Sequence, residues 1–256
     1  MTTPDPHHPT GPGTILITGA SSGIGRATAH RLAAAGHDVV LLARREGRLR
    51  DLAEQLSDAH GVQAMAVPTD LTRTDALAET VDAVLAEVPG LAGAVLAAGH
   101  GRGHGAVREA DTTAWASQLQ VNLLAPMLLT KLLLPSLDRN GGRLILIGSV
   151  FGHRPMPGYA PYAAAKHGLA AFARSLALEE RPPGGCRVSL LSPGATNTEF
   201  ASVLAGEETP RVHDVTAWPY HPLLAEDVAR AVAWILRQPP HVRIAELQID
   251  PTDAAY

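Results

Sequence analysis

The sequence predicts a single α/β domain, built as a doubly wound parallel sheet of about seven strands with helices on both faces. Short, nearly continuous apolar segments rich in Val, Ile and Leu alternate with longer segments of helical periodicity. Strands of this composition are typical of a parallel sheet that helices cover on both sides. The chain shows no linker and no internal repeat of roughly 20–50 residues, so we expect residues 13–256 to form one domain.

The elements follow from these patterns in order. The predicted strands are the apolar segments 14–18, 38–43, 62–67, 93–98, 143–149, 187–192 and 245–250. Helical periodicity predicts helices over 24–35, 73–88, 113–137, 160–180 and 225–237, and a polar helix with Leu49, Leu52 and Leu56 on one face. Pro126 predicts an irregularity in the long helix 113–137.

One long segment, residues 199–224, shows no clear periodicity. Loops of that length in a compact domain are usually functional. We therefore expect a substrate lid there, with Phe200, Trp218 and Tyr220 forming an apolar pocket wall.

Composition excludes several classes of function. The net charge of −4 provides no basic field for nucleic acid. No apolar run reaches the roughly 20 residues of a membrane span, and residues 1–12 resemble a disordered leader rather than a secretory signal. The lone Cys186 excludes an internal disulfide and suits a reducing cytosol. We expect a soluble, cytoplasmic protein without nucleic-acid or membrane partners.

The stretch "TGASSGIG", residues 18–25, joins the first strand to the first helix. Gly19 permits a tight turn, Gly23 permits close approach of a ligand, and Gly25 permits close helix–strand packing. The helix N-terminus offers N–H donors and a partial positive charge to a pyrophosphate. Although the spacing is G-x-x-x-G-x-G rather than G-x-G-x-x-G, its position predicts a Rossmann-like dinucleotide site.

The residues after the second and third strands bear on cofactor choice. NAD-binding sites usually have an acidic residue at the end of the second strand, where it binds the ribose 2′-hydroxyl. In this chain that position holds Arg44, and Arg45 follows it. A guanidinium matches a 2′-phosphate, so we predict NADP(H) in preference to NAD(H), with Arg44 favoured over Arg45. Solvated arginines at a helix start are the alternative. Asp70 either accepts from the adenine amino group or serves as a turn or N-cap residue.

Four motifs occur in order: "TGASSGIG", "GS" at 148–149, "YAAAK" at 162–166 and "SPGATNTE" at 192–199, with Ser149 lying 13 residues before Tyr162. With this set, the chain resembles the short-chain dehydrogenase/reductase family from about residue 13 to 253. The segments "READTTAW" (108–115) and "IDPTDAA" (249–255) are similar to a subgroup that reduces small carbonyl compounds, including clavulanic-aldehyde-type reductases.

The resemblance implies a catalytic tetrad of Asn122, Ser149, Tyr162 and Lys166. Tyr162 would act as general acid/base, and Lys166, one helical turn away, would lower the phenol pKa and hold the nicotinamide ribose. Ser149 would hydrogen-bond the substrate oxygen. Asn122 would hold a water that links Lys166 to solvent.

The resemblance also implies which residues contact the cofactor. These are Gly19, Ser21, Ser22, Gly23, Ile24, Gly25, Arg44, Arg45, Asp70, Leu71, Ala98, Gly99, Tyr162, Lys166, Pro193, Gly194, Thr196 and Thr198. Tyr159 is expected to line the substrate pocket. The family's usual Asn-Ala-Gly is Ala97-Ala98-Gly99 here, which predicts reduced local rigidity. The adjoining His100 and His104 lack a third ligand, so we expect a mobile substrate-side loop and no metal site.

These features together predict an NADP(H)-dependent oxidoreductase that interconverts a small-molecule carbonyl and an alcohol. An Ala-rich composition suits a role in bacterial secondary metabolism. The alternative is a dinucleotide-binding sensor or assembly protein without turnover, for which the missing Asn is the support. The family resemblance and two long helices suggest a homo-oligomer, either a tetramer or a dimer.

Overall fold

The computed structural model describes residues 12–88, 90–139, 141–180, 185–204 and 210–254. Apart from Pro12, the predicted leader lies outside this part of the chain. Seven parallel strands form the main sheet in the order β3-β2-β1-β4-β5-β6-β9. They are β1 (Ile15–Thr18), β2 (Val39–Ala43), β3 (Ala64–Pro68), β4 (Gly93–Leu96), β5 (Arg143–Ile147), β6 (Arg187–Pro193) and β9 (Glu246–Ile249). The predicted fold class is confirmed.

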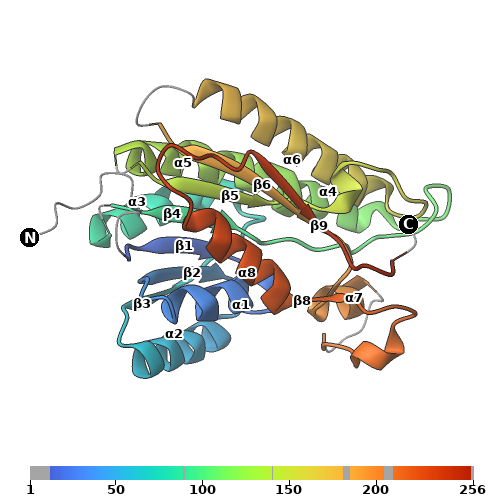
Figure 1. Cartoon of the computed structure of the whole chain (residues 1–256). Helices are drawn as coiled ribbons and strands as arrows, with labels where there is room; N and C mark the ends of the chain where they lie inside the picture. Colours follow the sequence, from blue (N-terminus) through green and yellow to red (C-terminus); the bar gives the residue numbers. More distant parts are fainter. Residues whose placement is uncertain (1–11, 89, 140, 181–184, 205–209, 255–256) are drawn as a thin grey trace, which may run out of the picture.

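Helices cover both faces of this sheet (Figure 1). They are α1 (Gly23–Ala33), α2 (Glu46–His60), α3 (Leu77–Glu87), α5 (Ala125–Arg139), α6 (Ala160–Glu179) and α8 (Ala225–Leu236). Alternate strand residues enter different cores: Leu16 packs in the cluster of α3, α5 and α6, whereas Ile15 and Ile17 pack in the cluster of α1, α2 and α8. Burial on both faces explains why the strand segments are apolar without interruption.

The strand order reverses between β1 and β4, because the chain builds outward from β1 through β2 to β3 and then returns to β4. In open α/β sheets, ligands bind at the carboxyl ends of the strands beside such a reversal. Thr18 at the end of β1 pairs with Leu42 of β2 and with Leu96 of β4. The loops after these three strands therefore lie side by side and position the site.

The predicted long helix is continuous from Thr112 to Arg139 but changes its winding. It comprises a short 3₁₀ turn η2 (Thr112–Ala114), α4 (Trp115–Leu119), the π-helical turn η3 (Gln120–Leu124) and α5. The irregularity expected from Pro126 is found just before this proline, which lacks the N–H that a regular turn would use.

The same helix corrects one expectation. By length and composition alone it could cross a membrane, with an 18-residue window of mean hydropathy 1.3. That is a weak indication, since the core helix of a single domain passes the same test. Leu129, Leu133 and Leu137 are buried in the core against the sheet.

Two details differ from the predicted elements. Strands β4 and β5 end two residues early, at Leu96 and Ile147, which leaves Gly148 and Ser149 in a loop. The 199–224 stretch contains α7 (Glu199–Leu204) and η5 (Val215–Ala217). Its last two residues form β8 (Leu223–Leu224), which pairs in parallel with β7 (Thr196–Asn197) just before the stretch. Two-residue strands and a six-residue helix are too short to produce a recognisable period.

Candidate active site

The glycine turn after β1 is packed so closely that a side chain at Gly19 or Gly25 would clash with neighbouring backbone atoms. Gly19 has a φ of +70°, and a Cβ on this residue would lie 2.9 Å from the backbone of Ala98. A Cβ on Gly25 would lie 2.5 Å from the carbonyl oxygen of Gly19. No side chain of the described residues caps α1 at Ser22, so the first N–H groups of the helix remain donors. Such a turn fits the pyrophosphate of a dinucleotide.

The two arginines after β2 differ in their engagement. Arg44 is exposed and makes no hydrogen bond or ion pair to the part of the chain that the structure describes. Arg45 is half-buried and donates from Nε to Ser21 Oγ at 3.1 Å and from Nη2 to Ser22 Oγ at 2.6 Å. Its Nη1 pairs with Glu199 of α7. Arg44 is thus the guanidinium free to receive a ligand.

Asp70 follows β3, and its Oδ1 accepts from the Thr72 amide at 3.0 Å and from the Thr72 hydroxyl at 2.9 Å. Partial burial acts to raise the pKa of Asp70, but these two hydrogen bonds and the charge of Arg44 outweigh burial and lower it. The sequence left open whether Asp70 binds the adenine amino group or stabilises a turn, and these hydrogen bonds to Thr72 are those of a turn residue. The second carboxylate oxygen, Oδ2, is not used in either of these hydrogen bonds.

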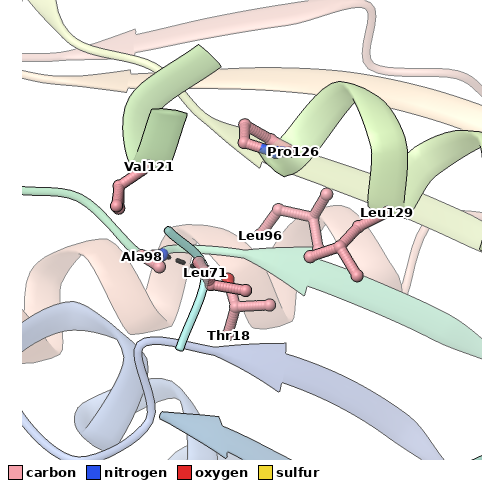
Figure 2. A pocket seen from close by; sticks show the side chains of 7 residues that line it. All are labelled: Thr18, Leu71, Leu96, Ala98, Val121, Pro126 and Leu129. Atoms are coloured by element: carbon pink, nitrogen blue, oxygen red, sulfur yellow. Dashed lines mark hydrogen bonds between the residues drawn. The ribbon is translucent and has the colours of Figure 1, made fainter. Parts of the chain in front are cut away.

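The loop after β4 is anchored although it lacks the usual Asn. Figure 2 shows Thr18 and Ala98 joined by a hydrogen bond from the Ala98 amide to Thr18 Oγ1, 3.1 Å long. The cavity beside them, bordered by Leu71 and Val121, measures about 10 Å³. That volume holds one water at most, so the cavity is too small for a ligand.

Ser149 follows the end of β5, and the side chain of Lys166 reaches the same strand end from α6. Ser149 Oγ accepts from the Phe151 amide at 3.2 Å, which leaves its hydroxyl proton free to donate. Lys166 is 4% exposed, and its Nζ donates to the carbonyl of Ile147 at 2.8 Å. A Cβ on Gly152 would lie 2.8 Å from the Lys166 carbonyl, so this glycine lets the turn after Ser149 pack on α6.

The ring centroid of Tyr162 lies 5.7 Å from Lys166 Nζ, and the Ser149 side chain is close enough to influence the phenol. Desolvation raises the pKa of Tyr162 to about 12, although the nearby Ser149 hydroxyl acts in the opposite direction. Desolvation also lowers the pKa of Lys166 to about 8. The predicted fall in the phenol pKa is therefore wrong for this structure, because burial dominates and the ammonium faces Ile147.

Asn122 lies in the π-helical turn and clamps the loop after β4. Its Oδ1 accepts from the His100 amide at 3.2 Å, and its Nδ2 donates to the His100 carbonyl at 2.8 Å. A Cβ on Gly99 would lie 2.6 Å from Asn122 Oδ1 and 3.8 Å from Lys166 Nζ. Only glycine therefore lets this loop pass between the two side chains. These two hydrogen bonds tie the loop to the helix, while the reduced rigidity expected from the missing Asn stays a prediction.

Residues after β6 form the opposite wall. The Gly194 amide donates to Ile249 at 2.8 Å, and Thr196 Oγ1 donates to the Gly194 carbonyl at 2.9 Å. Thr198 Oγ1 accepts from the Phe200 amide at 3.2 Å and so starts α7. A Cβ on Gly23 would lie 3.3 Å from the Thr198 side chain, so the glycine turn and this wall face each other closely.

Aromatic rings surround Tyr162. The Phe200 ring from α7 lies 5.5 Å from it and the Phe151 ring lies 6.3 Å away, edge on. The Tyr159 and Phe151 rings are tilted against each other with centroids 5.0 Å apart, and the His104 ring lies 6.2 Å from Tyr159. Sequence reasoning missed Phe151; its position two residues after Ser149, on the turn that holds Tyr162, is the signal that was available.

Comparisons with known proteins agree on one family. A family model described as short chain dehydrogenase matches residues 13–208. Sulfoacetaldehyde reductase 2 of Chromohalobacter salexigens is 32% identical over 94% of this chain and 95% of its own length. Serine 3-dehydrogenase of Agrobacterium fabrum is 32% identical over 95% of this chain and 96% of its own length.

Solved structures give the same result. An alcohol dehydrogenase from the archaeon Thermococcus sibiricus, complexed with 5-hydroxy-NADP, superposes with a TM-score of 0.85 at 29% identity, covering 95% of this chain and 98% of that one. The closed form of a serine dehydrogenase complexed with NADP⁺ gives a TM-score of 0.86 at 28% identity, covering 95% of this chain and 96% of that one.

Proposed function

Because this chain belongs to the short-chain dehydrogenase family, we propose that Tyr162, Ser149, Lys166 and Asn122 catalyse its reaction. The protein is an NADP-dependent oxidoreductase that interconverts alcohols and carbonyl compounds. The observation that carries the proposed mechanism is the placement of the Tyr162 ring 5.7 Å from the Nζ of the buried Lys166, next to Ser149. When bound, NADP(H) supplies or accepts the hydride.

Tyr162 is the proton donor to the carbonyl oxygen. A phenol whose pKa is raised to about 12 stays protonated at neutral pH, which suits donation to an oxygen that gains negative charge. Ser149 is fixed by the Phe151 amide and can hydrogen-bond the same substrate oxygen. We therefore propose that carbonyl reduction is the favoured direction at neutral pH.

Lys166 restores the proton on Tyr162. Its pKa of about 8 lies close to neutrality, so the amine can both hold and release a proton. Asn122 supports this relay through its backbone: Pro126, four residues on, has no N–H to occupy the Asn122 carbonyl. That carbonyl can hold the water that links Lys166 to solvent.

The cofactor contacts are divided between three loops. The glycine turn holds the pyrophosphate, and Arg44 with Arg45 faces the 2′-phosphate. The wall after β6, from Pro193 to Thr198, contacts the nicotinamide side. The substrate is a small aldehyde or ketone whose apolar substituent packs against Phe151 and Phe200, because these rings flank Tyr162.

A self-association surface is consistent with exposed leucines on the two longest helices. Leu119 and Leu124 are 43% and 42% exposed on the helix that contains α5, and Leu178 of α6 is 58% exposed. We propose a homo-oligomer, a tetramer or a dimer, in the cytoplasm. Light scattering coupled to size-exclusion chromatography measures the assembly, and a monomer would contradict it. A role in bacterial secondary metabolism stays a prediction.

The mechanism is tested with Tyr162→Phe. Loss of the general acid should lower kcat for aldehyde reduction by about 10²–10⁴-fold, while the NADPH dissociation constant, measured by nucleotide fluorescence, stays within about twofold. Tyr159→Phe is the matched control, since Tyr159 lies three residues earlier in the same aromatic group. Unchanged turnover in Tyr162→Phe would remove the proposed mechanism.

A further inference from the structure

The lid helix α7 is tied to helix α2 by the carboxylate of its first residue, Glu199. Glu199 Oε2 accepts from Arg45 Nη1 at 2.8 Å, and Oε1 accepts from Arg48 Nη1 at 2.7 Å. The Glu199 side chain is only 16% exposed, compared with 37% for Arg45 and 49% for Arg48. The better-buried partner is therefore the acid, and each of its oxygens holds one guanidinium.

Arg45 connects this ion pair to the glycine turn. Its Nε and Nη2 donate to the hydroxyls of Ser21 and Ser22, while its Nη1 is held by Glu199. All three nitrogens of the guanidinium are thus engaged. One side chain joins the turn expected to hold the pyrophosphate, the start of α2, and the lid.

This is also where a 2′-phosphate would bind. The adenosine ribose of a dinucleotide lies at the carboxyl end of the second strand, next to the residues that follow β2. The donors at that place are Arg44, Arg45, Ser21 and Ser22. A guanidinium binds phosphate with two parallel, charge-assisted hydrogen bonds, and the two serine hydroxyls can donate to the same group. Yet Arg45 is already paired with Glu199, and a phosphate there would bring a second anion close to this carboxylate.

We propose that Glu199 tunes cofactor recognition by competing with the 2′-phosphate of NADP(H) for Arg45. Binding of the phosphate weakens the Arg45–Glu199 pair, so recognition of the 2′-phosphate and attachment of the lid helix to α2 are coupled. Arg44, which has no partner among the described residues, is available to the phosphate from the start. When Arg45 binds the phosphate, Arg48 keeps its ion pair with Glu199. The inference rests on the use of NADP(H) by this chain.

The test is isothermal titration of the full-length protein with 2′,5′-ADP and with 5′-AMP, which differ only in the 2′-phosphate. Glu199→Gln removes the competing charge and keeps the shape of the side chain. We expect this variant to bind 2′,5′-ADP about two- to fivefold more tightly than the wild type, the range of a partly exposed ion pair. Its affinity for 5′-AMP should not change.

Two further variants sharpen the experiment. Glu46→Gln removes an equal charge from the start of α2, where Glu46 pairs with Arg50 rather than with Arg45 or Arg48, and it should leave the affinity for 2′,5′-ADP unchanged. Arg48→Gln leaves Glu199 to act on Arg45 alone, so it should weaken 2′,5′-ADP binding. Thermal melting of each variant verifies that it is folded.

Three outcomes would overturn the proposal. If Glu199→Gln binds 2′,5′-ADP no better or more weakly, then Glu199 holds Arg45 in place instead of competing for it. If Glu46→Gln produces the same gain, the effect is one of overall charge. If the wild type binds both nucleotides equally, recognition of the 2′-phosphate itself fails, and the competition fails with it; this result is distinguishable because it needs no variant.

Discussion

Replacing Lys166 by methionine should stabilise the protein at neutral pH while it removes activity. Burial lowers the pKa of this ammonium from 10.5 to about 8. Each pKa unit corresponds to about 1.4 kcal/mol, so holding the charged lysine in this position costs about 3 kcal/mol of folding free energy below pH 8. Methionine has a similar unbranched chain. The substitution also leaves the Ile147 carbonyl without its hydrogen-bond donor, and this loss cancels about 1–2 kcal/mol of the stabilisation gained by removing the charge.

The lowered pKa of Lys166 determines how folding stability changes with pH. Between about pH 8 and 10.5 the unfolded lysine keeps its proton while the folded one releases it, so this residue makes wild-type stability rise with pH across that window. Urea denaturation should therefore show Lys166→Met more stable than wild type by about 1–2 kcal/mol at pH 7. The advantage should shrink steadily toward pH 10.

Lys131→Met is the matched control, because Lys131, the chain's other lysine, is exposed on α5. Its stability should follow that of the wild type at every pH. The reasoning would be refuted by a Lys166→Met protein that is less stable than wild type at pH 7, or by a difference in stability that does not change with pH.

Other predictions follow from close contacts and perturbed groups. Gly25→Ala should lower the free energy of unfolding by at least about 2 kcal/mol, because the new Cβ would lie 2.5 Å from the Gly19 carbonyl oxygen. Gly47→Ala in α2 should raise that free energy by about 0.5–1 kcal/mol, because no atom lies within 4 Å of its new Cβ. Equal changes for the two variants in denaturation curves would contradict this reasoning. Burial raises the pKa of the Cys186 thiol to about 12, so a thiol reagent at pH 8 should label it only after unfolding. Alcohol oxidation needs Tyr162 as a base, so its kcat/KM should rise with pH through the alkaline range; a rate that is flat from pH 7 to 10 would count against that role.

The parts of the site that sequence could predict are those with a local cause. The glycine turn depends on residues a few positions apart, and the helical spacing of Tyr162 and Lys166 fixes which face they share. The position of Ser149 at a strand end follows from the alternation of strands and helices. Pro126 similarly predicted an irregular helix turn, because every proline lacks the backbone N–H that a regular turn needs.

The sequence by itself determined the fold class, because uninterrupted apolar strands with intervening amphipathic helices have few other ways to bury their surfaces. It also determined the residue types at the strand ends. Only the tertiary structure decided how these groups act on one another. It brought Glu199 to Arg45 across 154 positions of chain and set Asn122 on the backbone of His100. It also buried Lys166 and removed enough solvent from Tyr162 to move their pKa values in opposite directions. Contacts between distant segments and the loss of solvent depend on packing of the whole domain, and no local pattern encodes them.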